Sequence, residues 1–387
     1  MSRLADKVAG VLAGAAVGDA LGGATEGWTP EQIIERHGGE VTGIVPPYYA
    51  DWQTARPIAP YHKGDGHVTD DTLMTHALVE VYAHRRAHLD AFAVAEDLVP
   101  LMIGEPRWIP ELEQEALILQ RVFLAEKWIV ARLHYGHVDP REAGVGNIIN
   151  CGATMYMAPV GLVNAGNPWG AYREAIDITG AHQASYGREA AGVFAAAVAA
   201  SLIPGATAES VLAVCLEVAK DGTRAAIHDV VAAVRELRAQ GGASNTALVR
   251  RTIRDAVAPY DTVGPIYRKP AMDARLPSRT KAIEELPAAL GFVLAHDGDT
   301  RAAVLGAVNY GRDSDSIATM AGAICGGLNG LASVPADWCT DIETASRINL
   351  GAVADVMTGV VQDVLRADAA SARELATAQD ALLAGVE

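Results

Sequence analysis

The spacing of apolar residues constrains the fold most, because they recur at helical intervals along almost the whole chain. Residues three and four positions apart share one face of an α-helix, whereas a half-buried strand alternates every second residue. No stretch keeps that alternation for more than a few positions. The spacing predicts helices over residues 4–21, 71–83, 112–133, 171–179, 189–203, 208–219, 227–239, 246–257, 281–295, 302–308 and 317–331, with a last one starting near Leu350. The predicted fold is all-α.

The composition agrees with this fold. Half of the 387 residues are apolar but only 5% are aromatic, and alanine and glycine supply much of the rest. Small side chains let helices approach closely, which favours packed helices over a β-sandwich. No linker and no internal repeat is visible. We therefore predict one compact multi-helix domain over residues 1–366 and a peripheral helix, rich in alanine, over residues 367–387.

Charge and cysteine content limit the functional classes. A net charge of −16 is wrong for a nucleic-acid surface, which needs clustered lysine and arginine. The four cysteines are scattered without a CxxC pair, so neither a zinc knuckle nor a disulfide framework is indicated. A reducing cytoplasm fits this pattern best.

Three uncharged runs are candidates for membrane spans. Residues 8–18 are too few to cross a bilayer, and residues 190–208 are interrupted by Pro204 and Gly205. Residues 316–336 are long enough but contain several glycines and Pro335 and directly follow two aspartates. Buried helices of a soluble protein explain all three runs better than a membrane does.

The first acidic cluster is Thr69-Asp70-Asp71. Thr69 is a good N-cap, and both aspartates fall in the first turn of the helix predicted over residues 71–83. Acidic residues at a helix N-terminus are favoured by the helix dipole. Taken alone, this cluster is explained by helix capping.

The second acidic cluster is Asp313-Ser314-Asp315-Ser316, where a glycine turn enters a helix of small residues. Alternate carboxylates in a turn point the same way, which suits a hard cation. The glycine and the glutamate that an EF-hand requires are not in place. Small residues indicate a helix packed closely on every side, so two carboxylates at its start would repel unless a cation neutralised them.

The two clusters lie far apart in the chain, and their spacing cannot show that they meet. They share one composition, however, a hydroxyl group and two aspartates at a helix start. Oxygen ligands of this kind select magnesium, calcium or manganese over zinc. Two such ions about 3.5–4 Å apart could hold an oxygen-rich substrate and a water.

Two further segments are singled out. Gly10, Gly14 and Gly18 recur every four residues, which puts them on one helical face where another helix can approach. Their order is not that of a dinucleotide-binding fingerprint. The loop over residues 45–67 is long for a compact domain, and its tyrosines and Trp52 predict a lid or a pocket wall.

Three motifs together resemble the ADP-ribosylglycohydrolase family. They are Ala16-Val17-Gly18-Asp19-Ala20-Leu21-Gly22 with Glu26, then Thr69-Asp70-Asp71-Thr72, then Gly311-Arg312-Asp313-Ser314-Asp315-Ser316-Ile317-Ala318. They occur in the family's order and span residues 10–330. The resemblance implies an all-α fold with a cleft that holds two Mg²⁺ ions, with Mn²⁺ as the alternative. The implied metal ligands are Thr69, Asp70, Asp71, Asp313, Asp315 and Ser316.

The resemblance also implies catalytic groups. Glu26 would be a ligand or the carboxylate that handles the attacking water, and Asp70 and Asp315 complete the predicted catalytic set. The family's last motif usually reads Gly-Gly-Asp-Thr-Asp-Thr. Here serine replaces both threonines and keeps the hydroxyl oxygen, and Arg312 replaces the second glycine. Arg312 would either meet the substrate or pair with a neighbouring carboxylate.

Further substrate-binding residues are implied by a fourth family segment, a Gly-Asn-Gly run followed by Met-Arg and Pro. It is altered here to Asn150-Cys151-Gly152-Ala153-Thr154-Met155-Tyr156-Met157-Ala158-Pro159. Gly152 and Tyr156 are the predicted contacts, and Tyr156 stands where arginine is usual. His182 matches a family histidine near the substrate. Other histidines, His62 and His67 among them, show no metal-ligand spacing.

The resemblance implies a magnesium-dependent hydrolase that cleaves the ribosyl glycosidic bond of an ADP-ribosylated protein or a small ADP-ribosyl compound, and the cysteine pattern adds a cytoplasmic location. A nucleoside or another small ribosyl compound is the first alternative, which Tyr156 and the aromatic loop favour. A non-catalytic ribosyl-binding protein is the second, and retention of all the ligand types argues against it. We expect neither nucleic acid nor membrane as a partner.

Overall fold

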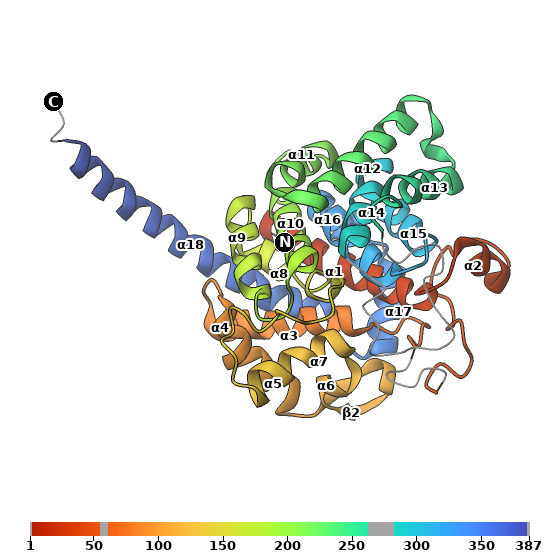
Figure 1. The fold of residues 1–387 in the computed structure, drawn as a ribbon, viewed down its shortest axis with the longest axis horizontal. Helices are drawn as coiled ribbons and strands as arrows, with labels where there is room; N and C mark the ends of the chain where they lie inside the picture. Colours follow the sequence, from red (N-terminus) through yellow and green to blue (C-terminus); the bar gives the residue numbers. More distant parts are fainter. Residues whose placement is uncertain (1, 55–60, 262–281, 385–387) are drawn as a thin grey trace.

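The computed structural model describes residues 2–54, 61–261 and 282–384, and they form a compact helical body from which one long helix projects (Figure 1). This confirms the all-α prediction. The helices are α1 (Arg3–Gly22), α2 (Pro30–His37), α3 (Asp70–Arg85), α4 (Ala91–Ala93), α5 (Val99–Ile103), α6 (Ile118–Arg121), α7 (Leu124–Val130), α8 (Ala158–Val163), α9 (Pro168–Thr179), α10 (Ser185–Ser201), α11 (Ala208–Val218), α12 (Asp221–Ala239), α13 (Thr246–Val257), α14 (Ala282–Ala295), α15 (Thr300–Val308), α16 (Ser314–Asn329), α17 (Ala336–Ser346) and α18 (Leu350–Leu383).

The continuous helix predicted over residues 112–133 is wrong. Its start belongs to an antiparallel hairpin of β1 (Arg107–Ile109) and β2 (Gln114–Ala116), in which Trp108 faces Glu115. The rest is divided between α6 and α7. Arg121 at the end of α6 is fully buried and pairs with the buried Glu111 in the hairpin's turn. This tertiary ion pair fixes the local chain path, and apolar spacing cannot reveal it.

Helices α1 and α16 pack against each other at unusually short range along their length. A Cβ atom added to Gly14 would overlap the carbonyl group of Gly322, and a Cβ on Gly322 would overlap that of Gly14. Gly10 meets Gly326 in the same way. This confirms the close approach predicted from the glycine spacing. As a result, the end of α1 lies beside the start of α16.

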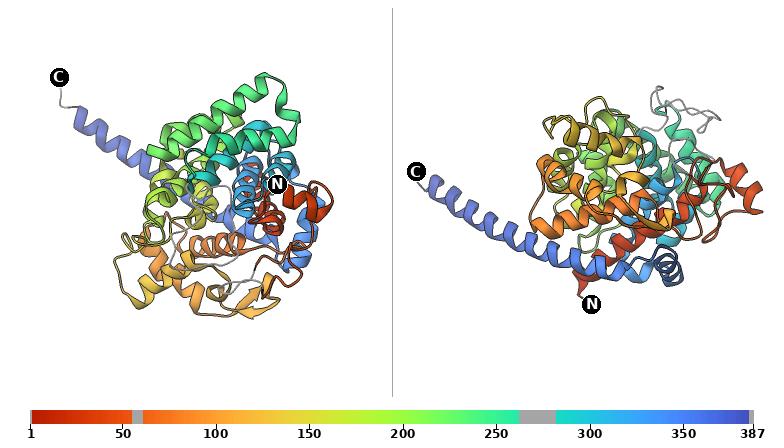
Figure 2. Two further views of the ribbon diagram at one scale, coloured as in Figure 1. Left: turned by 45° about the vertical axis from the view of Figure 1, so that its right-hand side comes forward. Right: turned by 90° about the horizontal axis from the view of Figure 1, so that it is seen from below.

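The last helix, α18, runs without a break from Leu350 to Leu383. Its first part packs on the body, whereas residues 371–384 are exposed and project away from it (Figure 2). The peripheral helix predicted over residues 367–387 is therefore the outer part of a longer helix, as far as the described residues extend. The division at residue 366 stays a prediction.

The uncharged runs considered as spans are core segments. Among the described residues, only Arg3–Thr25 is by itself long and apolar enough to cross a membrane, and its apolar window is completely buried. Helices α17 and α18 reach the length and apolar content of a membrane span only when they are counted as one helix, although the chain bends by 100° between them. Burial of α1, α10 and α16 confirms the prediction that these runs form buried helices.

Candidate metal centre

The end of α1 and the starts of α3 and α16 bring three carboxylates together. One oxygen from each of Asp19, Asp71 and Asp315 lies within 4.8 Å of the other two. All three side chains are buried. Two acidic clusters far apart in the sequence therefore meet, joined by a third aspartate. Asp19 lies in the first family motif but is not among the predicted ligands. The signal that could have found it is a charge among the apolar and small residues of α1.

Asp19 also holds the first turn of α3. The hydroxyl of Thr69 donates to Asp19 Oδ1 at 2.5 Å, and the backbone N–H groups of Thr69 and Thr72 donate to Asp19 Oδ2 at 2.9 and 3.1 Å. The hydroxyl of Thr72 donates to the same oxygen. Thr69 in turn accepts from the N–H of Asp71 at 3.3 Å, which confirms its predicted N-cap role. This network fixes the position of Asp71.

Burial disfavours the charged form of most of these carboxylates. Burial, partly offset by hydrogen bonds from the threonines, raises the pKa of Asp19 to about 6. Burial, opposed by Arg121, raises the pKa of Asp70 to about 8. Burial and the nearby Asp315 raise the pKa of both Asp71 and Asp313 well above the usual value. A bound cation would restore the charged forms.

The residues present fit a hard divalent ion. Within the described part of the chain, Asp71 Oδ1 and Asp315 Oδ1 are buried and have no hydrogen-bond partner. A buried carboxylate oxygen without a partner is costly. Carboxylate and hydroxyl oxygens are the donors that Mg²⁺ and Mn²⁺ prefer. The trio therefore offers both the free oxygens and the negative charge that such an ion requires.

The other predicted ligands lie around this trio. Asp70 is 3.7 Å from Arg121, measured from its Oδ1 to Nη1. Asp313 accepts a hydrogen bond from the thiol of Cys151 at 3.0 Å, and the same sulfur is 3.3 Å from the hydroxyl of Ser316. All are buried. The predicted ligands thus gather in one region, in which Asp313 contacts both Asp315 and Cys151.

His62 is a member of the site that the sequence did not indicate. Its Nε2 lies 2.8 Å from Asp315 Oδ2 and 3.6 Å from Glu26 Oε2, and its Nδ1 lies 3.2 Å from Glu111 Oε1. Burial alone would lower its pKa, but Glu111 and Asp315 raise the pKa of His62 well above the usual value. This position depends on a loop contact, so no local spacing could have predicted it.

A hollow opens beside these residues. Its lining is formed by Gly23, Ala24, Glu26, Trp28, Tyr48, Tyr49, Tyr61 and His62. Trp28 stacks on Tyr48 with 3.5 Å between ring centroids. The aromatic loop thus supplies three tyrosines to a pocket wall, one of the two roles predicted for it. The side chain of Glu26 is only 13% exposed, so it is not the surface residue that its local sequence suggests.

Three predicted substrate contacts form a separate buried group. Tyr156 and His182 are fully buried, and the tyrosine hydroxyl lies 3.0 Å from His182 Nδ1. His182 Nε2 is 3.5 Å from Glu126 Oε1. A Cβ added at Gly152 would overlap that same carboxylate. None of these three residues lines the aromatic hollow. Their predicted contact with substrate stays a prediction.

Arg312 pairs with carboxylates, which is one of the two roles considered for it. Its Nη2 lies 2.8 Å from Glu284 Oε2 and 3.0 Å from Asp261 Oδ2. The residue is buried, and its φ of +59° is in the left-handed region that favours glycine. That conformation explains why the family has glycine at this position. The ion pairs favour carboxylate pairing over substrate contact.

Fold and site together define a helical protein with a buried carboxylate cluster suited to divalent cations. The family model described as ADP-ribosylglycohydrolase matches residues 1–373. The chain therefore belongs to the ADP-ribosylglycohydrolase family, whose members are metal-dependent hydrolases.

A solved structure supports the fold. A chain of an "ADP-ribosylglycohydrolase-related protein complex" superposes with a TM-score of 0.59 and 20% identity, covering 93% of this chain and 100% of that one. At this identity the likeness shows the fold alone. No curated protein matches the chain.

Proposed function

We propose that this protein is a magnesium-dependent hydrolase that cleaves the ribosyl glycosidic bond of an ADP-ribosylated protein or of a small ADP-ribosyl compound. Family membership supports glycohydrolase chemistry. One observation carries the metal dependence, namely the convergence of Asp19, Asp71 and Asp315 with two buried carboxylate oxygens that lack a partner among the described residues.

In this proposal, Asp19 joins the predicted aspartate ligands of the two acidic clusters (Asp70, Asp71, Asp313 and Asp315) in holding the metal pair, and the hydroxyl groups of Thr69 and Ser316 complete the ligand set. Bound Mg²⁺ supplies charge that orients the ribose hydroxyls and activates a water. Residues of the chain itself transfer the proton and position the reacting groups. Glu26 faces the hollow and accepts the proton of the attacking water, and the resemblance adds Asp70 and Asp315 to the catalytic set. His62 fixes Asp315 through its 2.8 Å contact and lies beside Glu26. The buried negative charge favours the oxocarbenium-like state at C1′.

A smaller substrate is the second candidate. The described lining of the hollow contains three tyrosines and a tryptophan but no lysine or arginine that could pair with a diphosphate. Aromatic walls suit the face of a ring. A nucleoside or another small ribosyl compound would fit these features. A ribosyl-binding protein without activity is the third candidate, and it predicts metal binding without turnover.

The test is a hydrolysis assay on mono-ADP-ribosylated protein, ADP-ribosyl-arginine, ADP-ribose and nucleosides, before and after chelation. We expect EDTA to abolish hydrolysis and Mg²⁺ or Mn²⁺ to restore it. Asp71→Asn and Asp315→Asn should each lower activity by at least about 100-fold. Asp255→Asn is the matched control, because that carboxylate is 70% exposed. Hydrolysis that survives exhaustive chelation would refute the proposal.

A further inference from the structure

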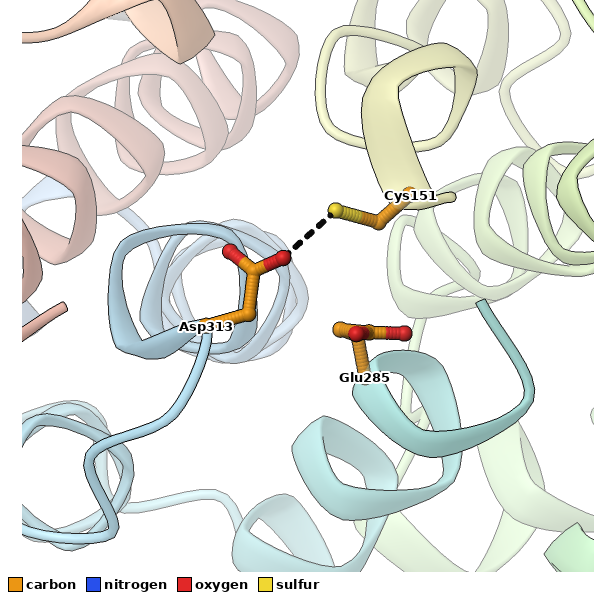
Figure 3. A group of neighbouring side chains, drawn as sticks. All are labelled: Cys151, Glu285 and Asp313. Carbon is orange, nitrogen blue, oxygen red and sulfur yellow. Dashed lines mark hydrogen bonds between the residues drawn. The ribbon is translucent and has the colours of Figure 1, made fainter. Parts of the chain in front are cut away.

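A second group of potential ligands lies beside the first. The sulfur of Cys151 and one oxygen each of Glu285 and Asp313 lie within 4.8 Å of one another (Figure 3). We propose that these three residues bind one divalent cation of the zinc class, in a site distinct from the oxygen-only trio.

Three separate elements build this site. Cys151 begins a single turn of 3₁₀-helix over Cys151–Ala153, Glu285 lies in the first turn of α14, and Asp313 directly precedes α16. Figure 3 shows the three side chains directed toward a common point. They are 4%, 1% and 8% exposed. Ligands from three rigid elements give a preformed geometry, which a metal site requires.

The carboxylate of Glu285, which is unpaired among the described residues, indicates that a cation binds here. Both of its carboxylate oxygens are buried, and neither has a hydrogen-bond partner in the part of the chain that the structure describes. The carboxylate lies beside Cys151 and Asp313, neither of which carries a positive charge. Leaving such a group unpaired is costly, so proteins rarely do it without a cation or a catalytic purpose.

The adjacent Glu284 shows how this protein satisfies a buried carboxylate when it uses its own residues. Glu284 accepts from Arg254 at 2.8 Å, from the hydroxyl of Tyr310 at 3.0 Å and from Arg312 at 2.5 Å. The arginine that precedes Asp313 thus donates hydrogen bonds to Glu284. The contrast indicates that Glu285 is satisfied by a bound ion.

The donor set decides the kind of ion. Zn²⁺ accepts thiolate and carboxylate donors together, and three protein ligands leave a fourth position for water. Mg²⁺ and Ca²⁺ take oxygen donors and avoid sulfur. On binding, the metal–sulfur bond forms and the thiol proton leaves to solvent. The family run has asparagine where Cys151 stands, so the sulfur donor is a departure from that pattern in this chain.

Asp313 is shared between this site and the ligand set of the proposed function. If the proposed function holds, zinc in this site withdraws Asp313 from the magnesium centre and inhibits hydrolysis. Binding itself does not depend on the proposed function. The two claims can therefore fail separately.

The test uses Co²⁺ as a spectroscopic substitute for Zn²⁺ in the full-length protein. A thiolate bound to Co²⁺ gives an intense near-ultraviolet charge-transfer band, which oxygen ligands do not. We expect the wild-type protein to develop this band on titration and to lose it when Zn²⁺ is added. Cys151→Ser should abolish the band, and Glu285→Gln should weaken Co²⁺ binding by at least about tenfold.

Cys339→Ser is the matched control, since Cys339 lies on α17 and is not one of the three grouped side chains, so its replacement should leave the band unchanged. Circular dichroism and thermal melts of each variant establish that it is folded. If Cys151→Ser does not fold, Glu285→Gln alone decides the question.

The proposal is wrong if no charge-transfer band appears, if the folded Cys151→Ser variant keeps it, or if Glu285→Gln binds Co²⁺ as the wild type does. A band in a protein with no magnesium-dependent hydrolysis would support this site and refute only the proposed function.

Discussion

At the scale of single residues, buried carboxylates in this protein fall into two kinds. Glu284 and Glu111 are paired with arginines, and Asp19 accepts several hydrogen bonds from threonines. Asp71, Asp315 and Glu285 instead keep buried oxygens without a partner among the described residues. The second kind marks the places where a cation completes the structure.

The ion pairs of Arg312 with Glu284 and Asp261 predict an effect on stability. Replacing Arg312 by alanine would leave Glu284 and Asp261 without this buried partner. A buried charge left wholly unpaired costs about 3–5 kcal/mol. Because Arg254 still pairs with both carboxylates, urea unfolding should show a smaller loss in the free energy of unfolding than that. The left-handed backbone at this position adds strain for alanine as it does for arginine.

The control for this change is Arg251→Ala, whose pair with Asp255 is 81% and 70% exposed. An exposed pair of this kind contributes about 0.3–0.5 kcal/mol. Equal effects of the two substitutions would show that the Arg312 network does not stabilise the fold.

Local chemistry explains which residues could be predicted. Thr69, Asp71 and Asp315 are found because a hydroxyl and carboxylates at a helix start form a readable local pattern. His62 and Glu285 carry no such pattern. Their surroundings arise from a loop and from α14, which come near α16 only in the folded chain.

At the scale of elements, the crossing of α1 and α16 positions the site. Asp19 lies near the end of α1, and Asp315 lies in the first turn of α16. Glycines along α1 bring the two helices within backbone contact. Their separation therefore sets the distance between the two carboxylates.

This contact predicts that Gly322→Ala destabilises the protein although alanine favours helices. The added methyl group would overlap the carbonyl of Gly14, and overpacking of this kind costs about 1–3 kcal/mol. The measurement is thermal or urea unfolding. Gly351→Ala, at an exposed position in α18, is the control and should be neutral or stabilising. An equally stable Gly322→Ala protein would contradict the close packing.

A histidine ties three elements together and predicts a pH dependence. His88, after α3, lies 2.5 Å from Glu174 of α9 and 3.1 Å from Asp368 of α18. The hydrogen bond to Glu174, opposed by burial and helped by Asp368, raises the pKa of His88 from 6.5 to about 9. A raised histidine pKa stabilises the fold fully below pH 6.5 and loses this effect as the pH rises through about 9.

His88→Gln should therefore lower the melting temperature at pH 6, and the difference from the wild type should shrink as the pH passes about 9. His134→Gln, at an exposed position, is the control and should leave the melting temperature unchanged at both pH values. A difference that grows with pH would show that the ion pairs at His88 do not stabilise the fold.

Helices could be predicted from the sequence where the buried residues lie on one helical face. The prediction failed where tertiary contacts determine the course of the chain. The helices at residues 281–295, 302–308 and 317–331 correspond closely to α14, α15 and α16 within the described residues. The hairpin of β1 and β2 was missed because its strands are three residues each and its turn is fixed by the Glu111–Arg121 pair.

At the scale of the whole molecule, the sequence predicts the all-α fold class and the protein family, and both predictions are confirmed. It does not predict that the outer part of α18 projects, because its alanines and leucines, such as Leu375 and Leu382, would suit a packed helix equally well. A cytoplasmic location and the absence of nucleic-acid or membrane partners stay predictions, since they rest on composition alone.

The proposed function depends on metal binding by the acidic cluster, and anomalous diffraction from crystals soaked in Mn²⁺ tests this binding directly. We predict anomalous peaks within coordination distance of Asp71 and Asp315, which should disappear in crystals of the Asp315→Asn variant. Peaks confined to exposed carboxylates, with none between the starts of α3 and α16, would contradict the proposed metal centre.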